Sequence, residues 1–495
     1  MKWLLSLYII VISLSFTVAN AAGATAPEWL GNTYGTVLSE DWMNVKFGGQ
    51  KMGFSYSKIE QGDNGYRIIS RAVVRLEIMG AMQDMSFSRS YYLDKNRNVI
   101  GFISLMKTMN QRQQTLGVIE NGSVHMKITG AGGTSAVTKK ISPGVQFAET
   151  MGFAIADKLK VGFKATIPVF IVELRANNTM DIEIVGQKTI QVDNKPTQVF
   201  VANITLQGFK SKSYITSSGV IVREEQSLMG IVSEKTDGDN AISFPASGSV
   251  PISSLITFSL IKPDKSLPGH SSIRELKLDI TGIKNPASLP GDERQVKGSP
   301  EWIKDLAGKR RLVIPLTIKR KQPGKSVPIS KAYKGDSGSV MPTPEIQSEN
   351  KMIKREAKKI VGDEKDAWEA AKKINRWVFS NVKKKLVDSF TAVDTLLAME
   401  GECQSHTNLF AALGRSVGLP VKVASGIVYS SENEGFLYHA WPEVYVGEWV
   451  AMDPTLGQDV ADATHIKLAE GGVESQLQLV RFIGKLNITI NSYSK

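Results

Sequence analysis

Residues 401–410 read GECQSHTNLF and contain the only cysteine of the chain, Cys403. Apolar residues then recur at helical spacing until Pro420, which ends the run: Leu409, Phe410, Ala412, Leu413 and Val417. We therefore predict a helix that begins at Cys403. Free backbone N–H groups and the positive dipole end of such a helix favour a thiolate, the reactive form of cysteine, and could also stabilise an oxyanion.

Two strand-like runs follow this helix, separated by a tight Gly447-Glu448 turn. The first run begins at His439 and the second ends at Asp453. A thiol nucleophile needs a nearby base, and the base needs a third group that orients its ring. Cys403, His439 and Asp453 are therefore the predicted catalytic residues. A strict two-residue turn would place His439 and Asp453 on opposite faces, so we expect an odd-length loop or a bulge.

Four groups of residues within 345–465 occur together: Gly401-Glu402-Cys403; Leu409-Phe410 with Gly414-Arg415 and Gly418-Leu419-Pro420; His439-Ala440-Trp441 with Glu443-Val444-Tyr445; and Trp449 with Asp453-Pro454-Thr455. In combination they resemble the transglutaminase-like superfamily, which belongs with the papain-like thiol enzymes. The resemblance implies an α+β core in which a helix-borne cysteine faces a sheet that carries histidine and aspartate. It also implies thiol chemistry on amides, either hydrolysis or acyl transfer, without a metal.

Other residues compete for these roles. His406 lies one helical turn past Cys403, but side chains on one helix rarely reach an attacking geometry, and the family motif assigns the base to His439. The remaining alternatives are two histidines interpreted as ordinary surface or core residues and two aspartates that could replace Asp453: His125, His465, Asp459 and Asp462.

The papain-like plan also implies a second oxyanion donor, for which Trp377 and Gln404 are guesses outside the catalytic set. Trp441 and Trp449 are interpreted as core or cleft wall. No cofactor and no metal site is predicted, because one cysteine and five scattered histidines form no ligand cluster at workable spacing.

The chain opens with a short basic segment, an apolar run from Trp3 to Ala19 and small residues around Ala21. This pattern predicts a Sec-type signal peptide at residues 1–21, with an uncleaved membrane anchor as the alternative. We expect a periplasmic protein without a transmembrane span after signal removal, with secretion or membrane association as alternatives. A lone cysteine in an oxidising compartment cannot form an intrachain disulfide, so its retention favours reactivity.

Residues 22–245 are predicted to form a β-rich domain of antiparallel sheets, because glycine- and asparagine-rich turns separate short alternating runs. A weakly repeated strand pattern divides this region into possible halves at about 40–145 and 155–235. These would be two sheet layers or two parts of one large curved sheet. The region could bind a partner or substrate, or could simply support the enzyme.

Residues 246–340 are predicted to be a β connector with a basic stretch, which supplies much of the net charge of +12. The basic stretch could contact an anionic cell-envelope component, or could be a solvated strand face. Nucleic acid is not an expected partner, because the chain has no recognisable binding module. Residues 341–495 form the predicted catalytic domain, which opens with two amphipathic helices and a short helix capped by Thr391 or Asp394.

The favoured function is an exported cysteine-dependent amide hydrolase, a peptidase or amidase, that acts on a peptide or protein amide through a thioester intermediate. The motif does not separate hydrolysis from transamidation, because the two reactions differ only in the second nucleophile. A protein-glutamine transamidase is therefore one alternative. A non-catalytic envelope binding or assembly protein with a vestigial thiol fold is another.

Overall fold

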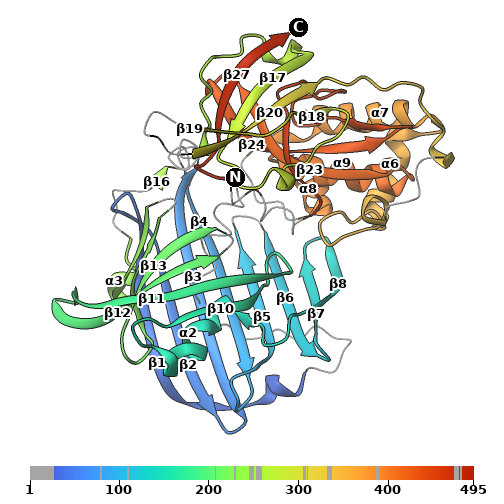
Figure 1. Ribbon diagram of the computed structural model, residues 1–495. Helices are drawn as coiled ribbons and strands as arrows, with labels where there is room; N and C mark the ends of the chain where they lie inside the picture. The colour runs from blue at the N-terminus through green and yellow to red at the C-terminus, as the bar shows by residue number, and fades with distance from the viewer. Residues whose placement is uncertain are drawn as a thin grey trace. The chain divides into compact units, whose positions relative to one another are not determined.

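The computed structural model describes residues 27–495 except 79–80, 109–110, 207, 228–229, 245–249, 252–258, 305–307, 309, 332–336, 386–390, 473–478 and 480–481. The predicted signal peptide, residues 1–21, lies outside the described residues. The described chain forms two compact units that meet in sequence between Ser254 and Leu255 (Figure 1). No helix in these described ranges is long and apolar enough to cross a bilayer.

The first unit is one large sheet made of two antiparallel meanders. The first meander comprises β1 (Tyr34–Phe47), β2 (Gln50–Gly62), β3 (Gly65–Ile78), β4 (Ala81–Leu93), β5 (Val99–Lys107), β6 (Arg112–Glu120), β7 (Ser123–Gly130) and β8 (Gly133–Lys140). After β9 (Gln146–Phe147) and α2 (Met151–Ile155), the second comprises β10 (Lys164–Ile171), β11 (Ala176–Val192), β12 (Lys195–Leu206), β13 (Phe209–Ile215), β14 (Ile221–Gln226) and β15 (Ile231–Thr236). The prediction of a β-rich, antiparallel N-terminal region is confirmed.

Strand pairing joins the two meanders, because β15 lies antiparallel to β1 over the register Trp42↔Thr236 to Phe47↔Ile231. Residues 40–145 and 155–235 are thus successive parts of one sheet. Tight hairpins are allowed by paired left-handed residues, as at Asp193 and Asn194, whose φ angles are 49° and 59°. The unit ends with α3 (Gly238–Ile242) and β16 (Val250–Pro251), which pairs with β3.

Side chains from both meanders share the core of this unit. Ile68, Tyr91 and Phe102 of the first meander pack with Phe147 and Phe170 of β9 and β10. A buried ion pair adds to this apolar contact: the guanidinium of Arg89 on β4 pairs with the carboxylates of Glu149 and Glu173. The curved sheet therefore encloses its own core, which is visible in Figure 1 as the strands that curve around α2.

The second unit combines a helical layer with two sheets. The helices are α5 (Ser337–Val340), α6 (Lys351–Val361), α7 (Ala367–Asn381), α8 (Ala392–Ala398) and α9 (Cys403–Ser416). One sheet has the order β25 (Trp449–Ala451), β24 (Gly435–Tyr445), β23 (Val421–Ser430), β26 (Ile466–Glu470). The other has the order β18 (Gln295–Lys297), β20 (Arg310–Lys319), β17 (Glu275–Thr281), β27 (Asn487–Ser494), with β19 (Glu301–Lys304) also on β20.

The segment 246–340, predicted as a connector, supplies β17 to β20 of this second unit from Leu255 onward. In β20 the apolar side chains Leu312, Ile314 and Leu316 are buried, whereas Arg310 and Arg311 at its start are exposed. Described basic residues of this segment thus lie at a solvated strand end.

Helix α9 is the centre of the second unit. Its residues from Ser405 to Arg415 are buried, and it packs against α6, α7, α8, β23 and β24. Directly before α9 lies the short strand β22 (Glu400–Gly401), which pairs with β21 (Lys383–Lys384). The preceding helix, α8, starts with a reciprocal cap in which Thr391 and Asp394 each accept the other's backbone N–H. The prediction that one of these two residues caps the helix is confirmed.

Candidate functional site

Cys403 is the first residue of α9 and is half-buried. Its thiol donates to the Oε2 atom of Glu402 over 3.2 Å. Gly401 permits this tight entry to the helix, because a Cβ atom there would lie 2.4 Å from the Cβ atom of Ser405. The predicted helix that begins at Cys403 is confirmed, and its N-terminal amides surround the position where a thiolate would form.

Helix α9 is joined to strand β24 by a buried hydrogen bond, in which the hydroxyl of Thr407 donates to the carbonyl oxygen of Ala440 over 3.1 Å. This contact lies next to His439. The imidazole of His439 lies close enough to the side chain of Cys403 for that side chain to raise the pKa of the ring. The helix and the strand thus bring the two predicted residues together.

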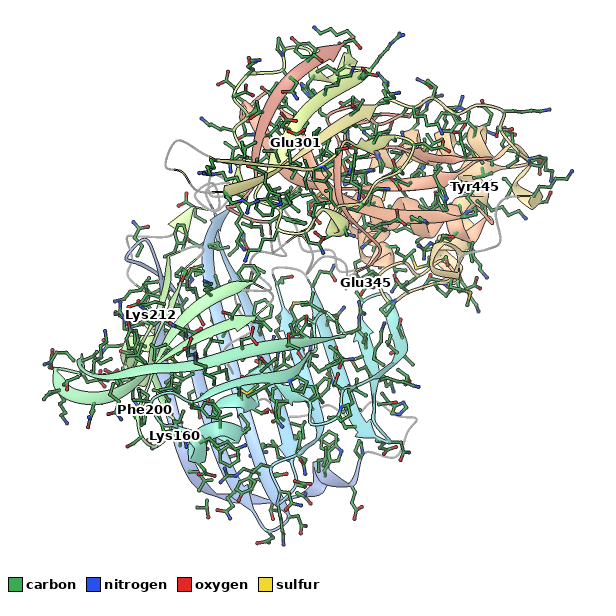
Figure 2. The ribbon with its side chains drawn as sticks, in the orientation of Figure 1. Lys160, Phe200, Lys212, Glu301, Glu345 and Tyr445 are labelled. Atoms are coloured by element: carbon green, nitrogen blue, oxygen red, sulfur yellow. The ribbon has the colours of Figure 1, made fainter. Side chains whose placement is uncertain are left out.

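The hairpin register places Asp453 on the same face as His439. Tyr445 pairs with Trp449, which leaves a three-residue loop between β24 and β25. Their rings lie 5.5 Å apart across this loop, and Tyr445 is labelled in Figure 2. The expected odd-length loop is confirmed. The Nε2 atom of His439 lies 2.7 Å from the Oδ2 atom of Asp453, which leaves Nδ1 for Cys403.

Asp453 is fully buried, and its other oxygen, Oδ1, accepts the backbone N–H groups of Thr455 and Leu456 over 2.7 and 2.9 Å. Burial alone would raise the pKa of this carboxyl, but the charge and hydrogen bond of His439 outweigh burial and hold the pKa far below its usual value. Asp453 is therefore a fixed anion that neither rotates nor takes up a proton near neutral pH.

The pKa of His439 is shifted in the opposite direction from that of Asp453. Burial would lower the pKa of its imidazole, but the negative charge and hydrogen bond of Asp453, followed by the contact with Cys403, raise it to about 10. The ring is consequently an imidazolium at neutral pH. A cation in contact with Cys403 favours the thiolate form of the nucleophile.

A second histidine contacts the same aspartate. The Nε2 atom of His465 lies 3.0 Å from the Oδ2 atom of Asp453, and its Nδ1 atom lies 3.2 Å from the Oδ1 atom of Asp462. His465 and Asp453 are fully buried. Burial would lower the pKa of His465, but the charge of Asp462 and the hydrogen bonds to both carboxylates raise it. Two rings and two carboxylates therefore form one continuous chain of hydrogen bonds.

The sequence interpretation missed this chain, because it treated His465 as an ordinary histidine and Asp462 only as a substitute for Asp453. His465 directly precedes β26, which pairs with β23 in a register interrupted by a bulge at Gly426. A Cβ atom on Gly426 would lie 2.0 Å from the carbonyl oxygen of Ile466. The one local signal for this chain of hydrogen bonds was that Asp462 and His465 lie three residues apart just before a strand. The pairing of that strand, β26, with β23 is a long-range contact, which the local sequence does not indicate.

A buried arginine from the neighbouring sheet holds the backbone of this segment. Arg294 donates through Nη1 to the carbonyl oxygen of His465 over 2.7 Å and through Nη2 to that of Asp462 over 2.6 Å. Next to it, the amide of Gln295 exchanges hydrogen bonds with the backbone of Lys467 over 2.8 Å. Residues outside the resemblance thus position part of the site.

The competing residues have other partners. Both ring nitrogens of His406 face backbone carbonyl oxygens, of Glu402 at 2.9 Å and of Val382 at 3.1 Å. Asp459 accepts from Asn375 and Arg376 on α7. Neither residue is available to act on Cys403.

Trp441, Gln404 and Trp377, which the sequence placed near the catalytic residues, have the following contacts. The ring of Trp441 is fully buried and stacks on His439 with a centroid separation of 6.2 Å. Gln404 donates to Asn408 on its own helix over 2.8 Å, and Trp377 packs partly buried against the helical core. Trp441 thus forms a wall behind the catalytic ring. The expected second oxyanion donor is not assigned to a residue, and Trp377 and Gln404 stay outside the catalytic set.

Three ligand-type atoms, from His439, Asp453 and His465, lie within 4.8 Å of one another and could hold a metal ion. In the described structure these atoms are hydrogen-bonded to each other, so a metal ion could bind only by replacing those bonds. The absence of a metal requirement stays a prediction.

One family model matches the part of the chain that carries this site. The family model of the transglutaminase-like superfamily matches residues 354–454. Comparison with curated proteins gives no match. Among solved structures, a candidate cysteine protease from Cytophaga hutchinsonii is 19% identical, with a TM-score of 0.30, over 45% of this chain and 85% of its own.

Two further solved structures are more distant in sequence. A Brucella abortus protein of a domain of unknown function is 12% identical, with a TM-score of 0.32, over 40% of this chain and 94% of its own. A candidate protease from Parabacteroides distasonis is 9% identical, with a TM-score of 0.18, over 72% of this chain and 68% of its own. Residues 354–454, which contain Cys403, His439 and Asp453, are thus the part of the chain that is similar to the transglutaminase-like superfamily.

Proposed function

We propose that the protein is a thiol-dependent amide hydrolase in which Cys403 is the nucleophile, His439 the acid and base, and Asp453 the residue that orients His439. The observation that supports this most strongly is the position of His439, which interacts with the side chain of Cys403 and is hydrogen-bonded through Nε2 to Asp453. This arrangement supplies nucleophile, proton carrier and orienting anion in one line.

In the first half of the reaction, the Cys403 thiolate attacks the carbonyl carbon of a peptide or glutamine-type amide, and a C–S bond forms. The backbone N–H of Cys403 stabilises the resulting oxyanion. The imidazolium of His439 then gives its proton to the leaving amine as the C–N bond breaks. The products at this point are a free amine, a thioester on Cys403 and a neutral imidazole.

In the second half, neutral His439 accepts a proton from water while the water oxygen attacks the thioester carbonyl. The C–S bond breaks, the carboxylic acid leaves, and the thiolate–imidazolium pair is restored. Asp453 keeps its negative charge throughout and stabilises the imidazolium state. If an amine replaces water at this step, the same residues catalyse transamidation. We favour hydrolysis in an exported, periplasmic protein.

The test is mass spectrometry of the full chain with a glutamine-containing peptide library and envelope extract, with and without a primary amine. Hydrolysis predicts amide cleavage that Cys403→Ala abolishes and that His406→Gln preserves. A mass gain equal to the amine less ammonia would instead identify a transamidase. If wild type and Cys403→Ala behave alike across the library, the enzyme proposal is wrong and the chain is a binding protein.

A further inference from the structure

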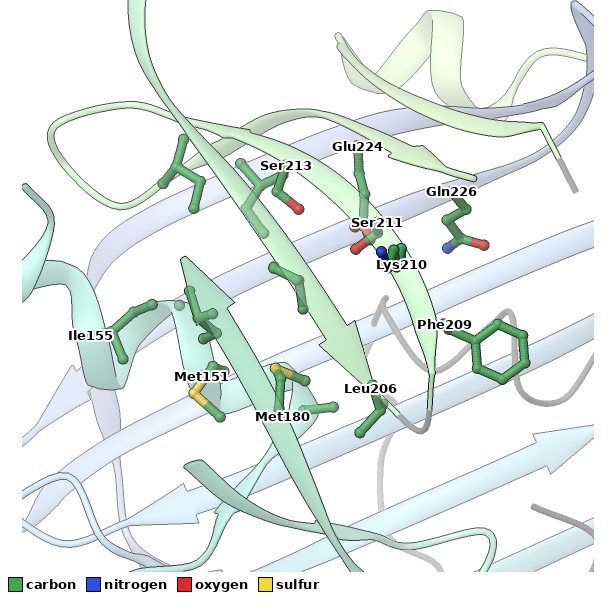
Figure 3. Close-up of a pocket in the computed structure, with 16 residues that line it drawn as sticks. Met151, Ile155, Met180, Leu206, Phe209, Lys210, Ser211, Ser213, Glu224 and Gln226 are labelled. Carbon is green, nitrogen blue, oxygen red and sulfur yellow. The ribbon is translucent and has the colours of Figure 1, made fainter. Parts of the chain in front are cut away.

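The first unit encloses an apolar cavity of about 130 Å³ between α2 and strands β11 to β14 (Figure 3). Met151 and Ile155 of α2 face Met180, Ile182 and Ile204 across it. Its volume is close to that of an engineered apolar cavity of about 150 Å³ that stays dry and binds benzene. The cavity therefore accepts an apolar group of about six carbon atoms.

One wall of this cavity is polar. Alternation along the paired strands β13 and β14 brings Ser211, Ser213, Glu224 and Gln226 to the same inner face, where Ser213 pairs with Glu224 and Ser211 with Gln226. The next residue along β13 from Ser211, Lys212, is exposed on the outer face and is labelled in Figure 2. The cavity thus has an apolar side and a row of hydrogen-bonding groups opposite.

Several of these inner polar atoms lack a partner among the described residues. The hydroxyl of Ser213 is fully buried and makes no hydrogen bond, and the Oε1 atom of Gln226 is likewise unpartnered. Buried polar groups in folded proteins are nearly always hydrogen-bonded, so such atoms at a cavity wall indicate a missing ligand or solvent partner.

Glu224 differs from the other buried carboxylates of this unit. Glu149 and Glu173 have the guanidinium of Arg89, whereas the contact that eases the burial of Glu224 is the hydroxyl of Ser211. Burial, only partly offset by that hydrogen bond, raises the pKa of Glu224. Among the described residues that line the cavity, the one cation is Lys210, which is exposed.

A second hollow of about 230 Å³ adjoins the first and shares Ala148, Gly152, Ile221 and Glu224 with it. Its lining is more polar and includes five serines and three acidic residues: Ser39, Ser55, Ser57, Ser70, Ser218, Asp41, Glu149 and Glu224. The hydroxyl of Ser70 is buried and unpartnered. Glu224 therefore lies at the junction of an apolar hollow and an acidic, hydrogen-bonding hollow.

We propose that the first unit binds a single-chain amphiphile whose alkyl end occupies the apolar hollow and whose polar end donates hydrogen bonds to Glu224 in the acidic hollow. Asp41 and Glu149 of this lining are paired with Lys235 and Arg89, so the acid that meets the head group is Glu224. Glu224 selects against an anionic head group, and the ligand class is therefore an alkyl amine or an alkyl alcohol. A buried carboxylate with no cationic partner gains most from an ammonium group. The unit thereby acts as a lipid-type receptor independent of the chemistry at Cys403.

The experiment is isothermal titration of the full chain with octylamine, 1-octanol and octanoate. We expect octylamine and octanol to bind, and octanoate to bind at least about tenfold more weakly than octylamine, since a hydrogen bond to a charged group contributes about that factor. Octanoate that binds as tightly as octylamine would show that Lys210 at the rim, and not Glu224, selects the head group. Absence of binding by both octylamine and octanol up to their solubility limits would overturn the proposal.

Two variants locate the ligand. Ile204→Trp fills the apolar hollow and should reduce octanol affinity at least about tenfold, whereas Thr205→Trp, on the outward side of the same strand, should leave it unchanged. Glu224→Gln should lower octylamine affinity to that of octanol. If Ile204→Trp does not fold, the wild type still decides the matter through chain length: affinity should rise from butylamine to hexylamine and then level off, because the apolar hollow accepts about six carbon atoms. An affinity that keeps rising through hexadecylamine would indicate surface adsorption and contradict the cavity.

Discussion

The Nε2 atom of His465 lies 3.0 Å from the Oδ2 atom of Asp453, the same oxygen atom that His439 contacts at 2.7 Å. Because two backbone amides hold the other oxygen of Asp453, the carboxylate cannot turn away from either ring. His465 is therefore best described as a residue that positions Asp453, and through it the ring that contacts Cys403.

Replacement of His465 should slow the reaction without changing substrate affinity. In His465→Gln, we expect kcat to fall about ten- to a hundredfold, the equivalent of one hydrogen bond to a charged group, with KM unchanged. Loss of the hydrogen bond from His465 leaves more of the Asp453 charge to His439, so the basic limb of the pH–rate profile should move to higher pH. The control is His125→Gln, in the other unit. An unchanged kcat and pH profile would refute the positioning role.

Asp453→Asn should reduce kcat by about 10⁴-fold, the magnitude seen when the aspartate of a related triad is replaced by its amide. The amide cannot stabilise the imidazolium of His439, and it removes the anion that both rings share. Asp459→Asn is the matched control, because Asp459 contacts α7 and not the site; its kcat should stay within a few fold. Steady-state kinetics on a cleavable amide checks both, and similar losses in the two variants would argue against the assigned role.

His406→Gln should lower the free energy of unfolding by about 1–3 kcal/mol, since the buried ring donates a hydrogen bond to one of the two carbonyl oxygens that face it, and the backbone N–H of His406 already serves that of Glu402. Turnover by the folded enzyme should persist, whereas His439→Gln should abolish it. Denaturant unfolding and kinetics on both variants distinguish the structural histidine from the catalytic one. A dead but stably folded His406→Gln enzyme would reverse the assignment.

The stability of the second unit should fall as pH rises from about 6.5 to 10. The pKa of His439 is raised to about 10 in the folded protein, so between its ordinary value and 10 the folded state binds the extra proton. The free energy of unfolding therefore decreases in this window, by up to about 1.4 kcal/mol per pH unit. Below pH 6.5 the contribution is fully present. His439→Gln should flatten this slope in urea titrations across the window, and an equal slope in wild type and variant would contradict the raised pKa.

Gly426→Ala should destabilise the protein by more than about 3 kcal/mol, because the new Cβ atom would lie 2.0 Å from the carbonyl oxygen of Ile466 and 2.9 Å from the ring of Trp441. The strand would have to move, and His465 with it. Gly186→Ala on β11 is the control, since nothing lies within 4 Å of the position of its Cβ atom. Thermal unfolding checks the pair; equal melting temperatures would show that β26 does not need the close approach.

Local sequence patterns were sufficient to predict much of the structure of the catalytic domain. The start of α9 at Cys403, the cap at Thr391 and the odd loop between β24 and β25 all depend on neighbours in sequence. Side chains on a strand alternate strictly between its two faces. For His439 and Asp453 to share a face, the loop between their strands therefore had to contain an odd number of residues or a strand had to bulge.

Long-range pairing was not predictable in the same way. His465 reaches Asp453 only because β26 lies antiparallel to β23 with a bulge, and Arg294, which directly precedes β18, reaches the His465 segment from far away in sequence. Nothing in either local stretch indicates the other. The inner polar row of the first unit was missed for a similar reason, because its serines and Glu224 come together only when β13 and β14 pair.

Strand β27, which is translated after every residue of the catalytic chain of hydrogen bonds, pairs along the whole of β17 from Glu275 to Thr281. Arg294, which directly precedes β18 of the same sheet, holds the backbone of His465 and Asp462. The arrangement at Cys403 therefore depends on contacts between segments that are made at very different times during translation, and the thiol reaches its full set of partners only once both have folded together.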